Sequence, residues 1–193
     1  MCSSDLALGP DVHGAHCVHC DGADRGLMRE RGVHAALCTR SNGILRAGQP
    51  PVADYLREGS PFGIGTDSLA SSPSLDLLEE AAALRALARA QGYAEDDLDQ
   101  RILTAATLGG AGAMGLADVG RLEPGARADL AVFGLAAAAG PGGADTVNGA
   151  VVGPGTAAAL AADPYGALLD AAAAGAHRCL ATVLGGKIVH RAA

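Results

Sequence analysis

The chain has 193 residues, of which 49% are hydrophobic and 18% are charged, a balance that suits a packed core and argues against disorder. Its formal net charge of −7 makes nucleic acids and anionic membrane surfaces poor partners, because both attract basic proteins. The residues after Met1 do not show the basic and apolar regions of a signal peptide, and we expect no membrane span because no apolar run is long enough. Together with five cysteines this favours free thiols, so we expect a cytoplasmic protein.

The first part of the chain alternates short apolar runs with helical segments. Asp21 is a good N-cap for the first predicted helix, and Gly32 is a good residue to end it. In chain order we predict a buried strand within residues 11–17, a helix over 23–31, a strand over 33–38, a helix over 52–58 and a strand over 62–66. Strands that alternate with helices in this way are typical of a parallel α/β sheet.

The second part of the chain begins with two amphipathic helices and then changes character near Gly115. We predict helices over residues 72–90, with Ser72 as N-cap, and over 97–108. Beyond them we predict a strand over 128–133, a flexible Ala/Gly/Pro-rich loop over 136–155 and a hairpin over 181–190 that turns at Gly185-Gly186. We therefore predict two domains, residues 1–115 and residues 116–193.

Asp67 is the first candidate for chemistry, because it follows a predicted strand in Gly65-Thr66-Asp67-Ser68. Reactive groups of parallel α/β folds lie at the carboxyl ends of strands. A carboxylate there can bind a metal ion or accept a proton from bound water. A turn or helix-capping aspartate is the competing interpretation.

The segment His13–Cys20 holds three histidines and two cysteines, which are zinc-ligand residue types. If His16 ends a strand, however, His16 and Cys17 point to opposite faces, and one site cannot collect all five side chains. A local zinc or thiol site therefore stays the alternative to a pocket lined by one or two of these histidines. Residues 39–43 form a predicted polar loop, in which Arg40-Ser41-Asn42 is either a plain turn or a means of orienting a substrate or a carboxylate.

Four motifs occur in order along the chain and together carry a family resemblance. They are Ala15-His16-Cys17-Val18, the segment 38–42 (CTRSN), the segment 65–68 (GTDS) and the segment 122–130 (LEPGARADL). In this order they resemble the amidohydrolase superfamily, in the branch of cytosine, guanine and adenosine-type aminohydrolases. Residues 65–78 and 88–93 are most similar to the aminodeoxyfutalosine deaminases of menaquinone biosynthesis.

The resemblance implies an α/β fold: the C-terminal part of a TIM-like (β/α)8 barrel, with strands 6–8 in residues 1–115, and part of a small β-sandwich in residues 116–193. It implies a divalent metal, zinc with iron as the alternative, with Asp67 as a metal ligand and proton acceptor. His16 would stabilise the charge that develops when metal-bound hydroxide attacks the ring. The substrate-binding residues that it implies are His19, Arg40, Ser41, Asn42 and Ser68.

The resemblance further implies hydrolytic deamination of a small adenine-like substrate such as aminodeoxyfutalosine, with a homodimer as the candidate assembly of the full-length enzyme. The family's H-x-H and H-x-x-E motifs do not occur here, and three strands are few for a barrel. We therefore expect a truncated chain that alone binds metal weakly, is inactive and tends to aggregate. Ring-chloride and amide hydrolases would use the same residues. The second hypothesis is a non-catalytic α/β module with a local zinc or thiol site at His13–Cys20.

Overall fold

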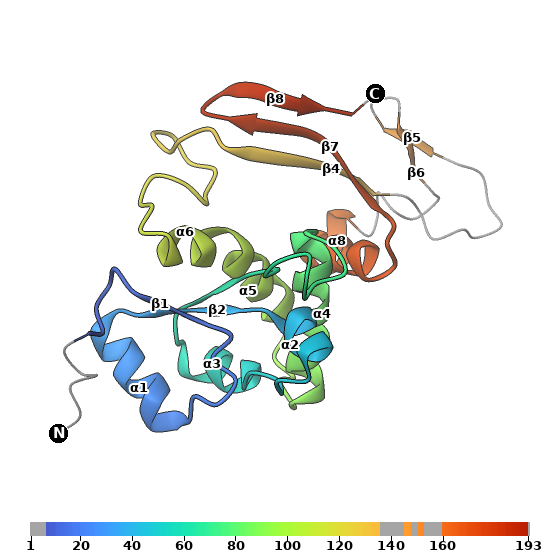
Figure 1. Cartoon of the computed structure of the whole chain (residues 1–193). Helices are drawn as coiled ribbons and strands as arrows, with labels where there is room; N and C mark the ends of the chain where they lie inside the picture. Colours follow the sequence, from blue (N-terminus) through green and yellow to red (C-terminus); the bar gives the residue numbers. More distant parts are fainter. Residues whose placement is uncertain (1–6, 136–144, 148–149, 153–159, 193) are drawn as a thin grey trace. The chain divides into compact units, whose positions relative to one another are not determined.

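The computed structural model of the protein describes residues 7–135, 145–147, 150–152 and 160–192 (Figure 1). The chain divides into two structural units, Met1–Arg121 (unit 1) and Leu122–Ala193 (unit 2). Each unit is described separately below. No helix in the described residues is both long enough and apolar enough to cross a membrane.

Unit 1 is built on a parallel three-stranded sheet, as the sequence predicts. The strands β1 (His13–Ala15), β2 (His34–Leu37) and β3 (Phe62–Ile64) lie in the order β1-β2-β3. The helices α1 (Gly22–Arg31) and α3 (Val52–Glu58) lie in the connections between them, and α2 (Thr39–Leu45) precedes α3. The parallel register places the carboxyl ends of all three strands at one edge of the sheet.

The ends of α1 and α3 follow from local chemistry. Asp21 accepts hydrogen bonds from the N–H groups of Ala23 and Asp24, and the Asp24 carboxylate accepts one from the N–H of Asp21, which completes a capping box. Gly32 and Gly59 end the two helices in the left-handed conformation that glycine adopts without strain. The predicted bounds of these helices are confirmed to within one residue.

Three sequence predictions in unit 1 are wrong. β1 is not a buried strand: His13 and Ala15 are exposed, because β1 lies at an edge of the sheet. Residues 39–43 do not form a loop but the first turn of α2. The helix predicted from Ser72 begins at Leu77 instead, because Asp76 and not Ser72 accepts the first N–H groups of α4 (Leu77–Ala90).

The helix predicted over residues 97–108 is a composite that runs on to Ala113. It consists of α5 (Leu98–Thr104), a π-helical turn η2 (Ala105–Gly109) and α6 (Gly110–Ala113). In Figure 1, α5 and α6 lie on the face of the sheet opposite to α1 and α3. A Cβ atom on Gly109 would stand 2.1 Å from the carbonyl oxygen of Phe62, so the two backbones are in direct contact there.

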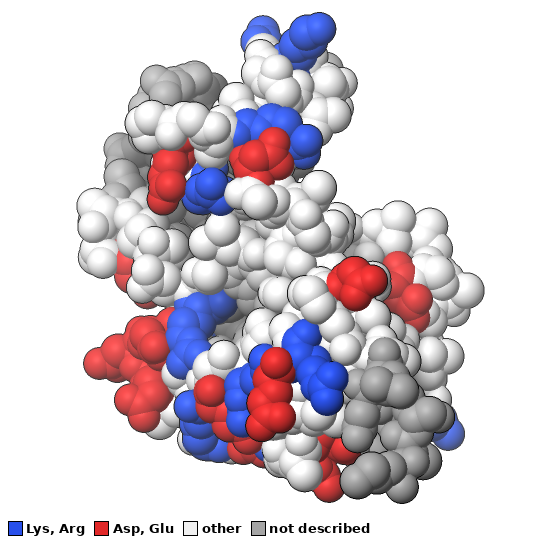
Figure 2. All heavy atoms as spheres, turned by 90° about the vertical axis from the view of Figure 1, so that its left-hand side faces the viewer, with Lys and Arg blue, Asp and Glu red and all other residues white. Residues whose placement is uncertain are grey.

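Acidic and basic side chains lie next to one another on the face that Figure 2 shows. Part of this mixture of charges consists of ion pairs between α1 and α3. Arg25, with a side chain 7% exposed, pairs with Glu58 at 2.7 Å, and Arg29 pairs with the same carboxylate at 2.7 Å. Hydrogen bonds from Arg25, Ser60 and Arg29 lower the pKa of Glu58 to about 2.

Unit 2 contains an antiparallel sheet in the order β4-β7-β8, formed by β4 (Leu130–Leu135), β7 (His177–Leu184) and β8 (Lys187–Arg191). The predicted terminal hairpin is confirmed, with Gly185 and Gly186 both at positive φ. α8 (Pro164–Ala173) is not among the predicted helices, although Asp163 as N-cap and Pro164 at the first position are typical of a helix start.

The prediction of a flexible loop over residues 136–155 falls largely outside the described residues. Within that stretch the structure describes two short strands, β5 (Asp145–Val147) and β6 (Ala150–Val152). They pair antiparallel in a two-stranded sheet, so these six residues are not loop.

Candidate active site

The candidate site lies at the carboxyl ends of the three parallel strands of unit 1. His16 follows β1, Ser41 and Asn42 lie in the first turn of α2 behind β2, and Asp67 follows β3. The neighbouring ends of parallel strands bring these four residues together, although up to 51 positions separate them in the sequence.

Asp67 is held by hydroxyl groups. Ser41 Oγ and Ser71 Oγ each donate a hydrogen bond of 2.7 Å to its Oδ2 atom. These two bonds, Ser41 first, and the N–H of Ser68 lower the pKa of Asp67 below its ordinary value. The carboxylate is therefore charged at neutral pH. Its backbone has a φ of 59°, which is rare for a residue with a side chain.

His16 is oriented by Asn42. Its Nδ1 atom lies 2.8 Å from Asn42 Oδ1. Because an amide oxygen only accepts hydrogen bonds, this orientation of the Asn42 amide assigns the ring proton to Nδ1. Its Nε2 atom lies 3.9 Å from Asp67 Oδ2. The side chains of His16 and Asp67 are 35% and 32% exposed, so both can be reached from solvent.

Arg40, a predicted substrate-binding residue, points away from this site. All five N–H groups of its guanidinium have protein acceptors: the carboxylates of Glu79 and Glu80, the hydroxyl and carbonyl groups of Ser74 and the carbonyl of Asp76. Arg40 therefore ties α2 to the start of α4 and has no donor left for a substrate.

In the described residues, no hydrogen bond joins the side chain of His19 or Ser68 to Asp67 or His16. His19 is exposed and lines a separate cavity of about 470 Å³ together with Cys20, Arg25 and Gln49. The side chain of Ser68 is exposed, and only its backbone N–H supports Asp67.

Ser71 and Glu80 support the candidate site but are not among its predicted residues. Ser71 is 6% exposed and lies four residues after Asp67 in a serine-rich loop. The composition of this loop does not indicate which of its serines bonds to Asp67. Glu80 is fully buried, and its signal is its position: it shares the face of α4 on which Leu84 and Ala88 are buried.

The segment His13–Cys20 does not fold into a metal site. The described residues contain no group of three or more histidine, cysteine, aspartate or glutamate side chains arranged for a metal ion. His16 and Cys17 both have positive φ, so they form a turn and do not alternate along a strand as predicted. Cys17 is 8% exposed and donates to the carbonyl of Gly14, while His13 is exposed.

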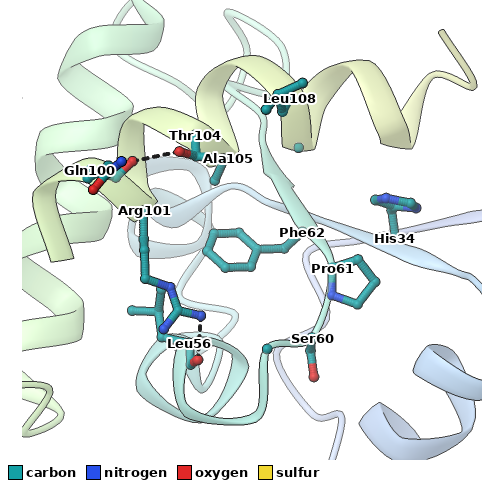
Figure 3. A pocket seen from close by; sticks show the side chains of 12 residues that line it. His34, Leu56, Ser60, Pro61, Phe62, Gln100, Arg101, Thr104, Ala105 and Leu108 are labelled. Carbon is teal, nitrogen blue, oxygen red and sulfur yellow. Dashed lines mark hydrogen bonds between the residues drawn. The ribbon is translucent and has the colours of Figure 1, made fainter. Parts of the chain in front are cut away.

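A cavity of about 390 Å³ lies at the opposite, amino-terminal end of the sheet, where Phe62 and His34 begin their strands (Figure 3). Figure 3 shows two of its polar groups bonded within the protein: Arg101 donates to the carbonyl of Leu56, and Thr104 to that of Gln100. Since Asp67 and His16 lie beyond the other ends of the strands, this cavity is separate from the candidate site.

Comparison with known proteins agrees with the family resemblance of the sequence motifs. Residues 4–188 match the amidohydrolase family. The chain is 42% identical to a 5-methylthioadenosine/S-adenosylhomocysteine deaminase of Pelotomaculum thermopropionicum over 122 residues, 62% of this chain and 28% of that protein. It is 37% identical to an S-triazine hydrolase of Gordonia rubripertincta over 123 residues, 63% of this chain and 26% of the relative. The chain thus spans less than a third of the length of these relatives.

The fold has solved counterparts. An adenosine deaminase from Xanthomonas campestris with bound zinc superposes with a TM-score of 0.71 at 28% identity, over 94% of this chain and 37% of that one. This likeness confirms the expected fold class. Because the family match covers residues 4–188 and the fold agrees, the chain belongs to the amidohydrolase family.

Proposed function

We propose that the protein is a metal-dependent aminohydrolase that replaces the amino group of an adenine-type ring by a carbonyl group and releases ammonia. The observation that carries the proposal is the pairing of a charged carboxylate, Asp67, with an oriented imidazole, His16, at the carboxyl edge of a parallel sheet. Relatives named as deaminases of adenine nucleosides support the reaction class.

The donor chemistry of the site suits a zinc ion. Zinc takes carboxylate oxygen and imidazole nitrogen as ligands, and iron takes the same donors. Asp67 is the residue that we propose as a metal ligand, and the zinc bound by the adenosine deaminase neighbour supports zinc over iron. Three or more ligand side chains do not gather in the described part of the chain, so the remaining ligands would come from elsewhere in the protein. When bound, the metal supplies water that is activated for attack at neutral pH.

Asp67 and His16 have different tasks in this proposal. Ser41 and Ser71 keep the Asp67 carboxylate charged, as a ligand and proton acceptor must be. Asn42 holds the proton of His16 on Nδ1, which turns Nε2 toward Asp67. A proton that Asp67 takes from water can then pass to the leaving amino group, while His16 interacts with the oxygen that bonds to the ring carbon.

The finer proposal is that the substrate is aminodeoxyfutalosine. It rests on the resemblance of residues 65–78 and 88–93 to the deaminases of that compound. The first of these segments contains Asp67 and Ser71 and borders the site. The second lies at the end of α4, where Gln91 accepts a hydrogen bond from the N–H of Ala53 in α3 and donates one to the carbonyl of Pro50. Only the first therefore bears on substrate choice in this proposal.

The test is an ammonia-release assay on the zinc-loaded full-length protein, because residues 1–193 alone are expected to be inactive. The compounds are aminodeoxyfutalosine, methylthioadenosine, S-adenosylhomocysteine, adenosine and a chlorotriazine. We expect deamination of an adenine compound and a loss of about 10²-fold or more for Asp67→Asn and for His16→Asn. His13→Asn is the matched control for His16, because His13 is exposed on β1, the strand that His16 follows, and its replacement should keep full activity. Chloride release from the triazine alone would favour the triazine hydrolase reaction. A zinc-loaded full-length protein without activity on any of these compounds would overturn the proposal.

A further inference from the structure

We propose that Glu80 is a positioning residue of the site, although it touches neither Asp67 nor His16. It lies in α4, and its side chain has no exposed surface. The effect of Glu80 on catalysis rests on the proposed function. The effect of Glu80 on the geometry of the site is independent of that function.

Glu80 caps the helix that carries the site residues. Its Oε1 atom accepts a hydrogen bond of 3.0 Å from the backbone N–H of Arg40, and its Oε2 atom accepts one of 2.8 Å from Arg40 Nε. The first turn of a helix leaves N–H groups without partners, and Cys38, the N-cap of α2, makes no side-chain capping bond. A carboxylate from another helix therefore fills the capping role, where negative charge is favourable.

The next two residues of α2 are those that hold the site. Ser41 and Asn42 are 0% and 1% exposed, so their side chains have no freedom to compensate for a shift of the backbone. Ser41 reaches Asp67 and Asn42 reaches His16 from this turn. Because α2 has only seven residues, its position depends on such tertiary contacts.

Glu79 provides a matched comparison in the same helix. It also pairs with the guanidinium of Arg40, but it is 36% exposed and, among the described residues, accepts no hydrogen bond from the backbone of α2. Neutralising Glu79 therefore removes a partner of Arg40 and leaves the cap of α2 in place. Neutralising Glu80 disturbs the cap itself, because a glutamine has one oxygen for the two N–H groups and turns its own N–H2 toward the other.

The readout is the ring tautomer of His16, taken from the ¹⁵N shifts of the full chain at about pH 9, well above the ordinary pKa of histidine. The signal is assigned by its loss in His16→Asn. We expect the Nδ1–H form in the unmodified chain and in Glu79→Gln, and a loss of that form in Glu80→Gln. In the zinc-loaded protein we expect a loss of zinc affinity or kcat of about tenfold or more for Glu80→Gln, and less than about twofold for Glu79→Gln.

If Glu80→Gln does not fold, the double variant Arg40→Met/Glu80→Met replaces it, because it removes the cap without leaving a buried charge unpaired. A folded Glu80 variant that keeps the Nδ1–H form, or an unmodified chain that lacks it, overturns the proposal. Loss of the Nδ1–H form in Glu80→Gln, together with no activity of the full-length protein on any adenine compound, would support the positioning role and refute the proposed function. The two failures are therefore distinguishable.

Discussion

Ser41 Oγ lies 2.7 Å from Asp67 Oδ2 and donates a hydrogen bond to it, which joins the first turn of α2 to the residue that follows β3. Ser71 donates to the same oxygen, and the two hydroxyls also lie 3.0 Å apart. Hydrogen bonds to a carboxylate stabilise its charged form. The lowered pKa of Asp67 is therefore due first to the two serine hydroxyls, and the N–H of Ser68 and the charge of His16 contribute less.

Replacing these serines should raise the pKa of Asp67 toward its ordinary value. In the unmodified chain the pKa of Asp67 is lowered from its ordinary value of 3.8, so its carboxylate stays charged as the pH falls below 3.8. In Ser41→Ala or Ser71→Ala the carboxylate should protonate at a higher pH. The double variant should show the larger effect. The measurement is a titration of the Asp67 carboxyl carbon by NMR.

Ser72→Ala is the control for this titration. Ser72 is also buried, but its hydroxyl donates to the carbonyl of Ser74 and not to Asp67. An unchanged titration of Asp67 in the double variant, or an equal change in Ser72→Ala, would contradict the assignment.

The strand-and-helix order of unit 1 could be predicted because its signals are local. Asp21 and Gly32 mark the ends of α1 through hydrogen bonds within a few residues. The role of residues 39–43 could not be predicted in this way. Their helix is capped by Glu80, forty positions away, and without that partner the segment carries only the signals of a turn.

The stability of unit 1 should fall as the pH is lowered from about 4.5 toward 2. Glu58 has its pKa lowered from the ordinary 4.5 to about 2, first by the hydrogen bond from Arg25, so its ion pair stabilises the fold above pH 4.5 and is lost through pH 2. Glu58→Gln should be less stable than the unmodified chain at pH 7 and should lose less stability over this pH range. Urea unfolding at a series of pH values measures both.

Arg57→Gln serves as the comparison, because its pair with Asp54 joins two residues of α3 that are both about half exposed. Such pairs contribute about 0–1 kcal/mol. If Glu58→Gln retained the full pH dependence of the unmodified chain, another acid would have to account for it.

Cys17 and Cys38 should react slowly with alkylating reagents. Burial is the main cause that raises the pKa of each thiol to about 11, helped by Cys20 in the first case and by Glu80 in the second. At pH 8 only about one thiol in a thousand is then a thiolate, and we expect alkylation about 10²-fold slower than in the urea-unfolded chain. Mass spectrometry of iodoacetamide-treated protein gives the rates.

The same experiment tests the zinc or thiol alternative for His13–Cys20. Zinc lowers the pKa of a thiol that binds it and protects it from alkylation. We expect excess zinc to leave the rate at Cys17 unchanged. Protection of Cys17 and Cys20 together would revive the local site.

Two of the site residues could be predicted from the sequence, and two of their buried partners could not. Asp67 and His16 were identified from strand ends and from a family resemblance, since parallel strands bring their carboxyl ends together. The buried partners Ser71 and Glu80 depend on which side chain faces which across the unit. The distance of Glu80 from α2 is set by packing of α4, and a pattern along the chain does not encode it.

Two adjacent glycines should respond in opposite ways to alanine. A Cβ atom on Gly109 would stand 2.1 Å from the carbonyl oxygen of Phe62, whereas on Gly110 the nearest atom would be 4.0 Å away. Both have helical backbone angles, so neither substitution strains φ. We expect Gly109→Ala to destabilise by about 1–3 kcal/mol through overpacking. Gly110→Ala should be neutral or stabilising by up to about 1 kcal/mol, because alanine favours the helix. Urea unfolding compares the pair, and equal effects would show that η2 does not contact β3 through its backbone.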